Sequence, residues 1–465
     1  MNEKHSRLLK DTVIFAVGSL GSKLILFFLV PLYTNYMTQA EYGVADLVYT
    51  ASELVVPFVS LVIFDAMLRF GLSREHRPED VLLVSLQVLA VGSLVTIALT
   101  PLLGLYPRLG PWKWYLSATV ILFMLSHTEM NYLKVTDRNK TYALISILQT
   151  LVLALTNLAL LVGFRLGIRG YLIASLAGSA TAVVLATFCG HIPSALRRAK
   201  PNRELRRQML LFSIPLILNN VSWWVIQSSD KFMVDFLVGA AALGLYTAAT
   251  KIPSLINVII GIFSQAWNIS AVREIEGNNE LDFYGDVLRT YSVVAIGAAL
   301  LVCAISKPFM LIYTGREFHS AWQYVPLLLA SAAFSAIADY YASLYRALKR
   351  SVRNSTSAMM AALVNIAVNF ALIPRLGVWG AVIGTVVAYA GLTLFRIVDV
   401  YRFLPFDPRW GLFLANSLLM LVQAVLVSLD WHAAAVSLVC LVLFVCVNRS
   451  VLRDILTGLK RFLRR

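Results

Sequence analysis

The sequence predicts an all-α integral membrane protein with about 14 transmembrane helices. We expect two parallel six-helix lobes around a central cavity, plus two extra C-terminal helices. Of the 465 residues, 59% are hydrophobic and 14% are charged, whereas soluble domains have about 45–50% apolar and about 25% charged residues. The apolar residues form runs of about 20, which is the length that crosses roughly 30 Å of hydrocarbon. An internal repeat, given below, predicts the two lobes.

Fourteen apolar segments are separated by short polar or basic stretches, and each is a candidate span. The first run is too long for the apolar part of a signal peptide, so it counts as a span. The seventh and eighth segments are interrupted by polar residues and the fourteenth is short, which leaves twelve or thirteen spans as alternatives. In chain order the segments are 12–36, 42–69, 81–105, 113–134, 142–163, 170–190, 209–236, 240–271, 288–306, 321–345, 355–374, 379–401, 409–429 and 432–448.

The distribution of Lys and Arg predicts the orientation. If the N-terminus is cytoplasmic, 29 of the 40 Lys and Arg residues fall in inside segments, and Lys23, Lys251 and Arg396 lie within spans. Cytoplasmic loops carry an excess of Lys and Arg, so both termini are expected inside, which requires an even number of spans. The formal net charge of +15 therefore calls for no nucleic-acid partner. The basic tail, 449–465, is expected to be an amphipathic helix on an anionic leaflet.

The chain repeats one plan in its two halves. NLALLVGFRLGIRG (157–170) and NFALIPRLGVWG (369–380) share an N-x-A-L and an R-L-G-x-x-G skeleton after a two-residue gap. Small residues follow at i, i+4 and i+8 in both halves, a pattern that lets helices approach closely. Six spans return the chain to its starting side, so the repeats are parallel, and two such lobes typically form an alternating-access transporter. The matching small residues are Gly170, Ala174 and Gly178 in the first half and Gly380, Gly384 and Ala388 in the second.

These patterns predict five regions. They are a six-helix lobe at 1–190, a basic cytoplasmic linker at 191–208, a second six-helix lobe at 209–402, two additional helices at 403–448, and the basic tail at 449–465. No outside loop is long enough for a catalytic domain, and the sequence has no Asp-x-Asp metal motif and no Gly-Lys phosphate loop. A membrane enzyme and an ATP-driven pump are therefore disfavoured. We expect no cofactor and no metal, while coupling to H⁺ or Na⁺ stays open.

Two stretches resemble a known family. LLKDTVIFAVGSLGSKLILFFLVPLYTNYMTQAEYGVADL (8–47) and SSDKFMVDFLVGAAALGLYTAATKIPSLI (228–256) are similar to bacterial polysaccharide and O-antigen-type oligosaccharide flippases. These belong to the superfamily of multidrug, oligosaccharidyl-lipid and polysaccharide exporters. The resemblance implies movement of an undecaprenyl-diphosphate-linked oligosaccharide from the inner to the outer leaflet of the bacterial cytoplasmic membrane. It also implies a role in cell-surface polysaccharide synthesis, beside other polysaccharide assembly proteins of the membrane.

Charged residues inside spans are expected to face the bundle interior or a wet cavity, because insertion at the bilayer centre costs about 2.5–3.5 kcal/mol. Lys23 and Glu53 both lie about 22 Å from the turn near residue 38, by helical rise. Asp230 and Lys251 are similarly matched around the turn near residue 240. One hypothesis is that Lys23 and Lys251 bind an anionic substrate, each held by its carboxylate until substrate arrives. The alternative is two permanent salt bridges that join the helix pairs.

Other polar residues give weaker hypotheses. Arg69 is a candidate first contact for the diphosphate, although an i,i+4 pair with Asp65 would serve only as helix support. Lys231, near the outer mouth, is expected either to bind substrate or to snorkel. His127 and Glu129 either relay protons or lie solvated at the cytoplasmic surface, and the solvated alternative is favoured.

The last candidates lie in the second of the two predicted lobes. Trp223 and Trp224 lie deep in a polar stretch and are candidates for stacking on sugar rings, with ordinary helix packing as the alternative. Arg396 and Asp399 are expected to snorkel to the inner surface. A cation-coupled multidrug exporter of the same superfamily is the main alternative function, since it would depend on acids in the cavity. The lysines inside spans favour an anionic substrate, because diphosphates accept charge-assisted hydrogen bonds.

Overall fold

The computed structural model describes residues 21, 24–73, 75–276, 281–348 and 350–463, and these residues contain helices and no strand. Ten helices of the described part are long and apolar enough to span a membrane, or eleven if one bent pair counts as a span. Helices also cover the remaining four predicted spans, of which the first is described only over Leu24–Tyr36. The predicted fold class, an all-α integral membrane protein with about 14 spans, is confirmed.

The chain divides by packing into two compact units, residues 1–228 and 229–465. The division falls inside one long helix, α9, Arg203–Leu237, which runs through the end of the predicted linker and the seventh span. The lobe boundaries expected from the sequence stay a prediction. The first unit contains α2 Gln39–Ser60, α3 Ile63–Gly71, α4 Pro78–Leu103, α5 Lys113–Val135, α6 Asn139–Asn157, α7 Gly167–Cys189 and α8 Ile192–Arg198, with short helices at Gly110–Trp112 and Leu158–Gly163.

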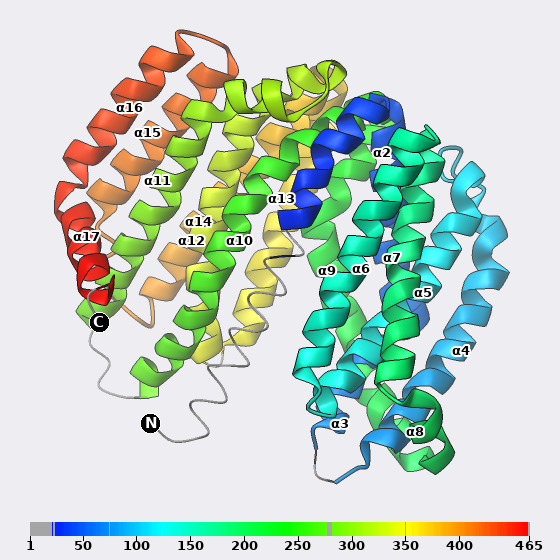
Figure 1. Cartoon of the computed structure of the whole chain (residues 1–465). Coiled ribbons are helices and arrows are strands. Elements are labelled where there is room, and N and C mark those ends of the chain that lie inside the picture. Colours follow the sequence, from blue (N-terminus) through cyan, green and yellow to red (C-terminus); the bar gives the residue numbers. More distant parts are fainter. Residues whose placement is uncertain (1–20, 22–23, 74, 277–280, 349, 464–465) are drawn as a thin grey trace. The chain divides into compact units, whose positions relative to one another are not determined.

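The second unit repeats the packing of the first. In the first unit, α5 packs against α2, α4 and α7, and α6 packs on α7. In the second unit, α12 packs in the same way against α10, α11 and α14, and α13 packs on α14. Its elements are α10 Ala240–Glu276, α11 Leu281–Tyr313, η3 Arg316–Tyr324, α12 Val325–Ala347, α13 Ser351–Leu376, α14 Val378–Tyr401, α15 Trp410–Ser428, α16 Ala433–Val447 and α17 Arg449–Leu463. Figure 1 shows α15 and α16 beside α11, where they add to this unit.

The small-residue stripes of the repeat form close helix contacts. A Cβ added at Gly178 would lie 3.0 Å from Cβ of Leu153 on α6. A Cβ added at Gly384 would lie 2.1 Å from Oδ1 of Asn369 on α13. The two-residue insertion in the first half is accommodated by a π-helical turn at Leu158–Gly163, which lets extra residues leave the α-helical register.

The predicted second span, 42–69, is not one continuous helix. Leu61 and Val62 have left-handed backbone angles, with φ of 51° and 53°, and they separate α2 from α3. Pro57 removes one helical donor shortly before the break. The hydroxyl of Ser60 accepts a hydrogen bond from the N–H of Val62 at 3.1 Å, which stabilises the turn. The apolar run gave no sign of this break.

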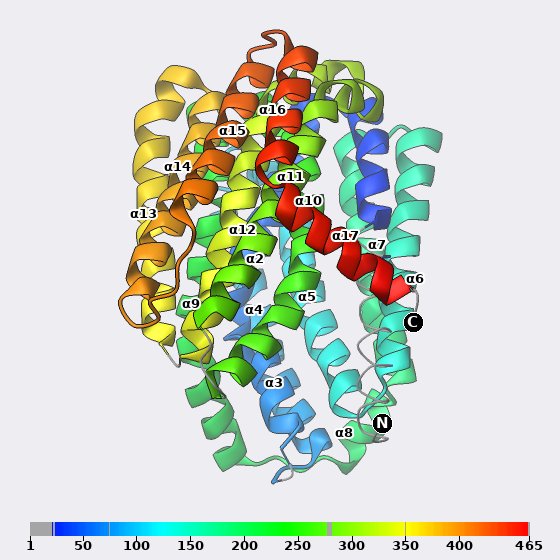
Figure 2. The same ribbon diagram turned by 90° about the vertical axis from the view of Figure 1, so that its left-hand side faces the viewer.

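Two shorter helices lie outside the spans. α8 occupies part of the predicted linker 191–208 and begins after His191, whose φ is 53°. α17 covers the predicted basic tail and is bent by 77° from α16. Figure 2 shows α17 crossing α11 at a steep angle to α16.

Candidate functional site

A buried carboxylate near the start of the second unit is held by a tyrosine. Asp230, on α9, is 7% exposed and accepts a hydrogen bond from the hydroxyl of Tyr246 on α10. Its Oδ1 also accepts from the backbone N–H of Lys231 at 2.9 Å. The side chain of Thr385, on α14, is a further polar neighbour of the Tyr246 hydroxyl. These contacts connect α9, α10 and α14 through one polar network.

The lysines of this region are half-buried. Lys231 lies beside Asp230, and its positive charge acts on that carboxylate. Lys251, on α10, likewise interacts with a neighbouring group, and it lies two residues before Pro253. Asp235, which the sequence analysis did not select, is 1% exposed on the same helix as Asp230. The sequence carries no signal for this burial, which depends on how the helix packs.

The expectation that Arg396 snorkels is wrong. Arg396 is 2% exposed and its guanidinium lies among α12, α13 and α14. It donates to the Ser357 hydroxyl at 3.1 Å, to the Ala338 carbonyl at 2.8 Å and to Oδ1 of Asn354 at 2.9 Å. Because the face of α14 that carries Arg396 packs on its neighbours, the side chain satisfies its donors inside the unit.

The expectation for Asp399 is wrong for the same reason. Asp399 is 5% exposed. Its Oδ1 lies 2.6 Å from Nη1 of Arg353, and its Oδ2 accepts from the Tyr345 hydroxyl at 2.7 Å. Together with Arg396 it forms a polar network that joins α12, α13 and α14.

In the first unit, Glu129 is buried and bound to a hydroxyl group, whereas the nearby His127 is exposed. Glu129, on α5, is 5% exposed and accepts from the Thr187 hydroxyl of α7 at 2.9 Å. His127 is exposed and stacks on Phe123 with ring centroids 4.2 Å apart. The favoured expectation of a solvated pair is therefore wrong for Glu129, and for His127 it stays a prediction. The proposed role of Glu129 in ion coupling stays a prediction.

Arg69 lies at the end of α3 with its charge accessible. The side chain is exposed, and its guanidinium carbon lies 4.9 Å from the ring centroid of Phe212 on α9. Among the described residues no carboxylate pairs with Arg69, so the helix-support pair with Asp65 does not form. A guanidinium that rests on an aromatic ring keeps its in-plane N–H donors free for an anion.

The remaining candidates lie around α2. Glu53 is half-buried and is the hydrogen-bond partner of Tyr49, one turn away. Trp224 donates from its indole N–H to the carbonyl of Thr50 at 2.9 Å, so it packs α9 on α2. Trp223 is 43% exposed. Lys23 lies outside the described residues.

The site chemistry is therefore that of hydroxyl-held carboxylates and separate basic residues. No group of three or more His, Cys, Asp or Glu residues in the described part is placed to hold a metal ion. The structure brings Asp230 together with Tyr246 and Lys231, and it places Arg69 beside Phe212. The substrate-binding roles of these residues stay predictions.

The model of a family described as "Polysaccharide biosynthesis protein" matches residues 8–267, which is more than half of the chain. No curated protein gives a significant sequence match.

Solved structures share the fold. A lipid II flippase, MurJ, in an inward closed conformation aligns with a TM-score of 0.70 at 15% identity, over 95% of this chain and 100% of that chain. An inward-facing multidrug resistance transporter of the MATE family in the MOP superfamily aligns with a TM-score of 0.64 at 13% identity, over 81% and 98%. A MOP superfamily transporter from Pyrococcus furiosus aligns with a TM-score of 0.56 at 13% identity, over 85% and 94%.

Proposed function

Because the chain belongs to the polysaccharide biosynthesis protein family, we propose that it is a flippase for an undecaprenyl-diphosphate-linked oligosaccharide. The protein would move this lipid from the inner to the outer leaflet of a bacterial cytoplasmic membrane by alternating access, for cell-surface polysaccharide synthesis. It would act as a transporter and not as an enzyme. Both termini would face the cytoplasm, where other membrane proteins of polysaccharide assembly would supply its substrate.

One observation from this chain carries the proposal for an anionic substrate. Arg69 is exposed, rests on Phe212 and has no carboxylate partner among the described residues. Phosphate oxygens accept bidentate hydrogen bonds from such a guanidinium. In the proposed orientation Arg69 lies at the cytoplasmic end of the second span, where a diphosphate headgroup would arrive first.

The other residues extend this pathway. Lys231 and Lys251 would attract the diphosphate deeper in the protein, and Lys23 would do the same from the first span. The exposed ring of Trp223 would stack on sugar, because a carbohydrate ring presents an apolar face to aromatic side chains.

A cation-coupled multidrug exporter is the second candidate. Asp230 and Glu129 favour it, because each is a buried carboxyl group held by a hydroxyl and could exchange a proton or cation. The same groups would serve ion coupling in a flippase, so they do not decide between the two functions.

A transport assay with purified protein in vesicles separates the candidates. One set of vesicles contains an undecaprenyl-diphosphate oligosaccharide, and its exposure on the outer leaflet is followed with a lectin. A second set contains a cationic dye under a proton or sodium gradient. The flippase proposal expects lectin exposure that Arg69→Ala reduces at least tenfold and no gradient-driven dye export. Dye export without lipid movement would reject it.

A further inference from the structure

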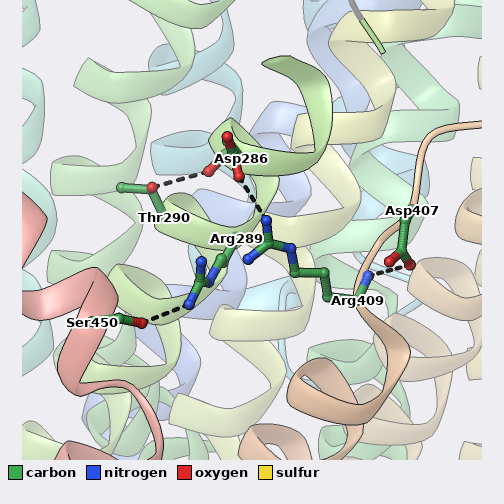
Figure 3. Close-up of polar contacts among 6 residues, drawn as sticks. All are labelled: Asp286, Arg289, Thr290, Asp407, Arg409 and Ser450. Carbon is green, nitrogen blue, oxygen red and sulfur yellow. Dashed lines mark hydrogen bonds and ion pairs between the residues drawn. The ribbon is translucent and has the colours of Figure 1, made fainter. Parts of the chain in front are cut away.

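Polar and charged residues from three segments of the second unit meet where α11 and α17 begin (Figure 3). Nη2 of Arg289, on α11, donates to the Ser450 hydroxyl of α17 at 2.7 Å. Asp286, one turn earlier, pairs instead with Arg409, and its Oδ1 lies 3.0 Å from Nη2 of Arg409. The carboxylate of Asp407 accepts the backbone N–H of Arg409 at 2.8 Å. Asp286 and Asp407 thus both interact with Arg409, in the segment before α15. No described carboxylate pairs with Arg289.

The direction of α17 is fixed by a buried amide pair. Asn448, between α16 and α17, is fully buried and exchanges two hydrogen bonds with Asn416 of α15, at 2.7 and 3.0 Å. It also donates to the carbonyl of Phe444 at 2.9 Å. Buried amides that satisfy one another this completely specify one geometry. Since α17 leaves α16 at 77°, it runs along the membrane surface if α16 spans the bilayer (Figure 2).

The sequence of α17 suits such a surface position. Arg449 and Arg453 are exposed, lie one turn apart and have no carboxylate partner among the described residues. Asp454 is the only acid in 449–465. The helix also carries the apolar residues Leu452 and Ile455, as do helices that lie in a membrane interface.

We propose that α17 and Arg289 form a docking site for anionic phospholipid headgroups of the leaflet on which α17 lies. Arg289 anchors the first turn of α17 through Ser450, and its guanidinium adds positive charge beside Arg449 and Arg453. Charge complementarity selects the occupant, since guanidinium groups bind lipid phosphates and an anionic leaflet attracts basic segments. The apolar positions of α17 would enter the acyl boundary, which a free phosphate ion could not occupy.

Native mass spectrometry of the purified full-length protein tests this proposal. The protein is titrated in detergent with phosphatidylglycerol and, separately, with phosphatidylcholine. We expect wild-type protein to retain phosphatidylglycerol in preference. Each basic residue near an anionic surface strengthens binding about fivefold, so Arg289→Gln with Arg453→Gln should weaken retention by about twenty-fivefold. Arg316→Gln removes the same charge from exposed η3 at the other end of α11 and should leave retention unchanged.

Three outcomes would overturn the proposal. The first is equal retention of the two lipids by wild-type protein, and the second is an equal loss in the Arg316→Gln control. The third is displacement of phosphatidylglycerol by millimolar inorganic phosphate, which would indicate a phosphate site and not a docked leaflet. If the double variant fails to fold, Arg453→Gln alone should show the fivefold loss, since its side chain is exposed. The binding readout involves no transport, so its result does not depend on the proposed flippase function.

Discussion

Each unit holds a buried acid that accepts a hydrogen bond from a hydroxyl group. Asp230 accepts from Tyr246, and Glu129 accepts from Thr187. A buried carboxylate requires hydrogen bonds or a counter-charge to offset its desolvation. Since Tyr246 supplies this for Asp230, a permanent salt bridge from Lys251 is not required to keep the acid buried. This arrangement favours the hypothesis that Lys251 serves the substrate.

We predict that Lys251→Ala abolishes transport while the protein stays in the membrane, and that Lys251→Arg keeps part of the activity. An anionic substrate needs the positive charge, whereas a helical bundle does not need a half-buried lysine to fold. Lipid translocation in vesicles and the amount of protein in the membrane are the two measurements.

The control for Lys251 is the double variant Asp230→Asn with Lys251→Ala. It removes both charges, so no unpaired acid is left behind. Normal transport by this double variant would mean that the two residues are structural and that the site assignment is wrong.

Arg69 gives a second prediction. Arg69→Ala should lower transport at least tenfold, which corresponds to the roughly 1.4 kcal/mol or more that a charge-assisted hydrogen bond contributes. Arg69→Lys should retain an intermediate activity, because it keeps the charge but not the bidentate donors. The matched control is Arg169→Ala, an exposed arginine at the first turn of α7. Equal losses in the two alanine variants would exclude a specific role for Arg69.

Helix contacts in both units depend on small residues at repeated positions. Gly384 of α14 lies against the amide of Asn369, and Gly178 of α7 lies against Leu153. Without side chains at these glycines, α13 and α6 approach their neighbours closely. Such contacts matter in a bilayer, because lipid tails provide no hydrophobic drive for helices to associate.

Gly384→Ala should therefore destabilise the protein by about 1–3 kcal/mol through overpacking. The same change at Gly391, on the same helix, has open space around its Cβ and should be neutral or slightly stabilising. Thermal unfolding of the two variants in one detergent gives the comparison. If both variants unfold at the wild-type temperature, the close contact with Asn369 does not contribute to stability.

Apolar length predicted the helices, but it could not predict their irregularities or rotation. The span at 42–69 was expected as one helix because its residues are apolar, and the left-handed Leu61 and Val62 carry no sequence signal. Arg396 was assigned to the surface from its depth alone, whereas its burial depends on which face of α14 meets α12 and α13. The acid Asp230 was selected as an intramembrane residue, but the sequence did not indicate its tyrosine partner, which lies 16 residues away on another helix.

The positive charge of the whole chain leads to a prediction of its topology. A reporter fused after Arg465 or inserted within 191–208 should be cytoplasmic, because basic segments remain inside. A reporter inserted at 375–379, where α13 gives way to α14, should be external. A periplasmic signal from the C-terminal fusion would contradict the even number of spans.

The central claim is that this membrane protein moves a lipid-linked oligosaccharide. Mass spectrometry of membrane lipids after depletion of the protein tests it most directly. We expect an undecaprenyl-diphosphate oligosaccharide to accumulate, and we expect wild-type protein but not the Lys251→Ala variant to reverse this. An unchanged pool of undecaprenyl-linked lipids, in cells that have lost the protein, would contradict it.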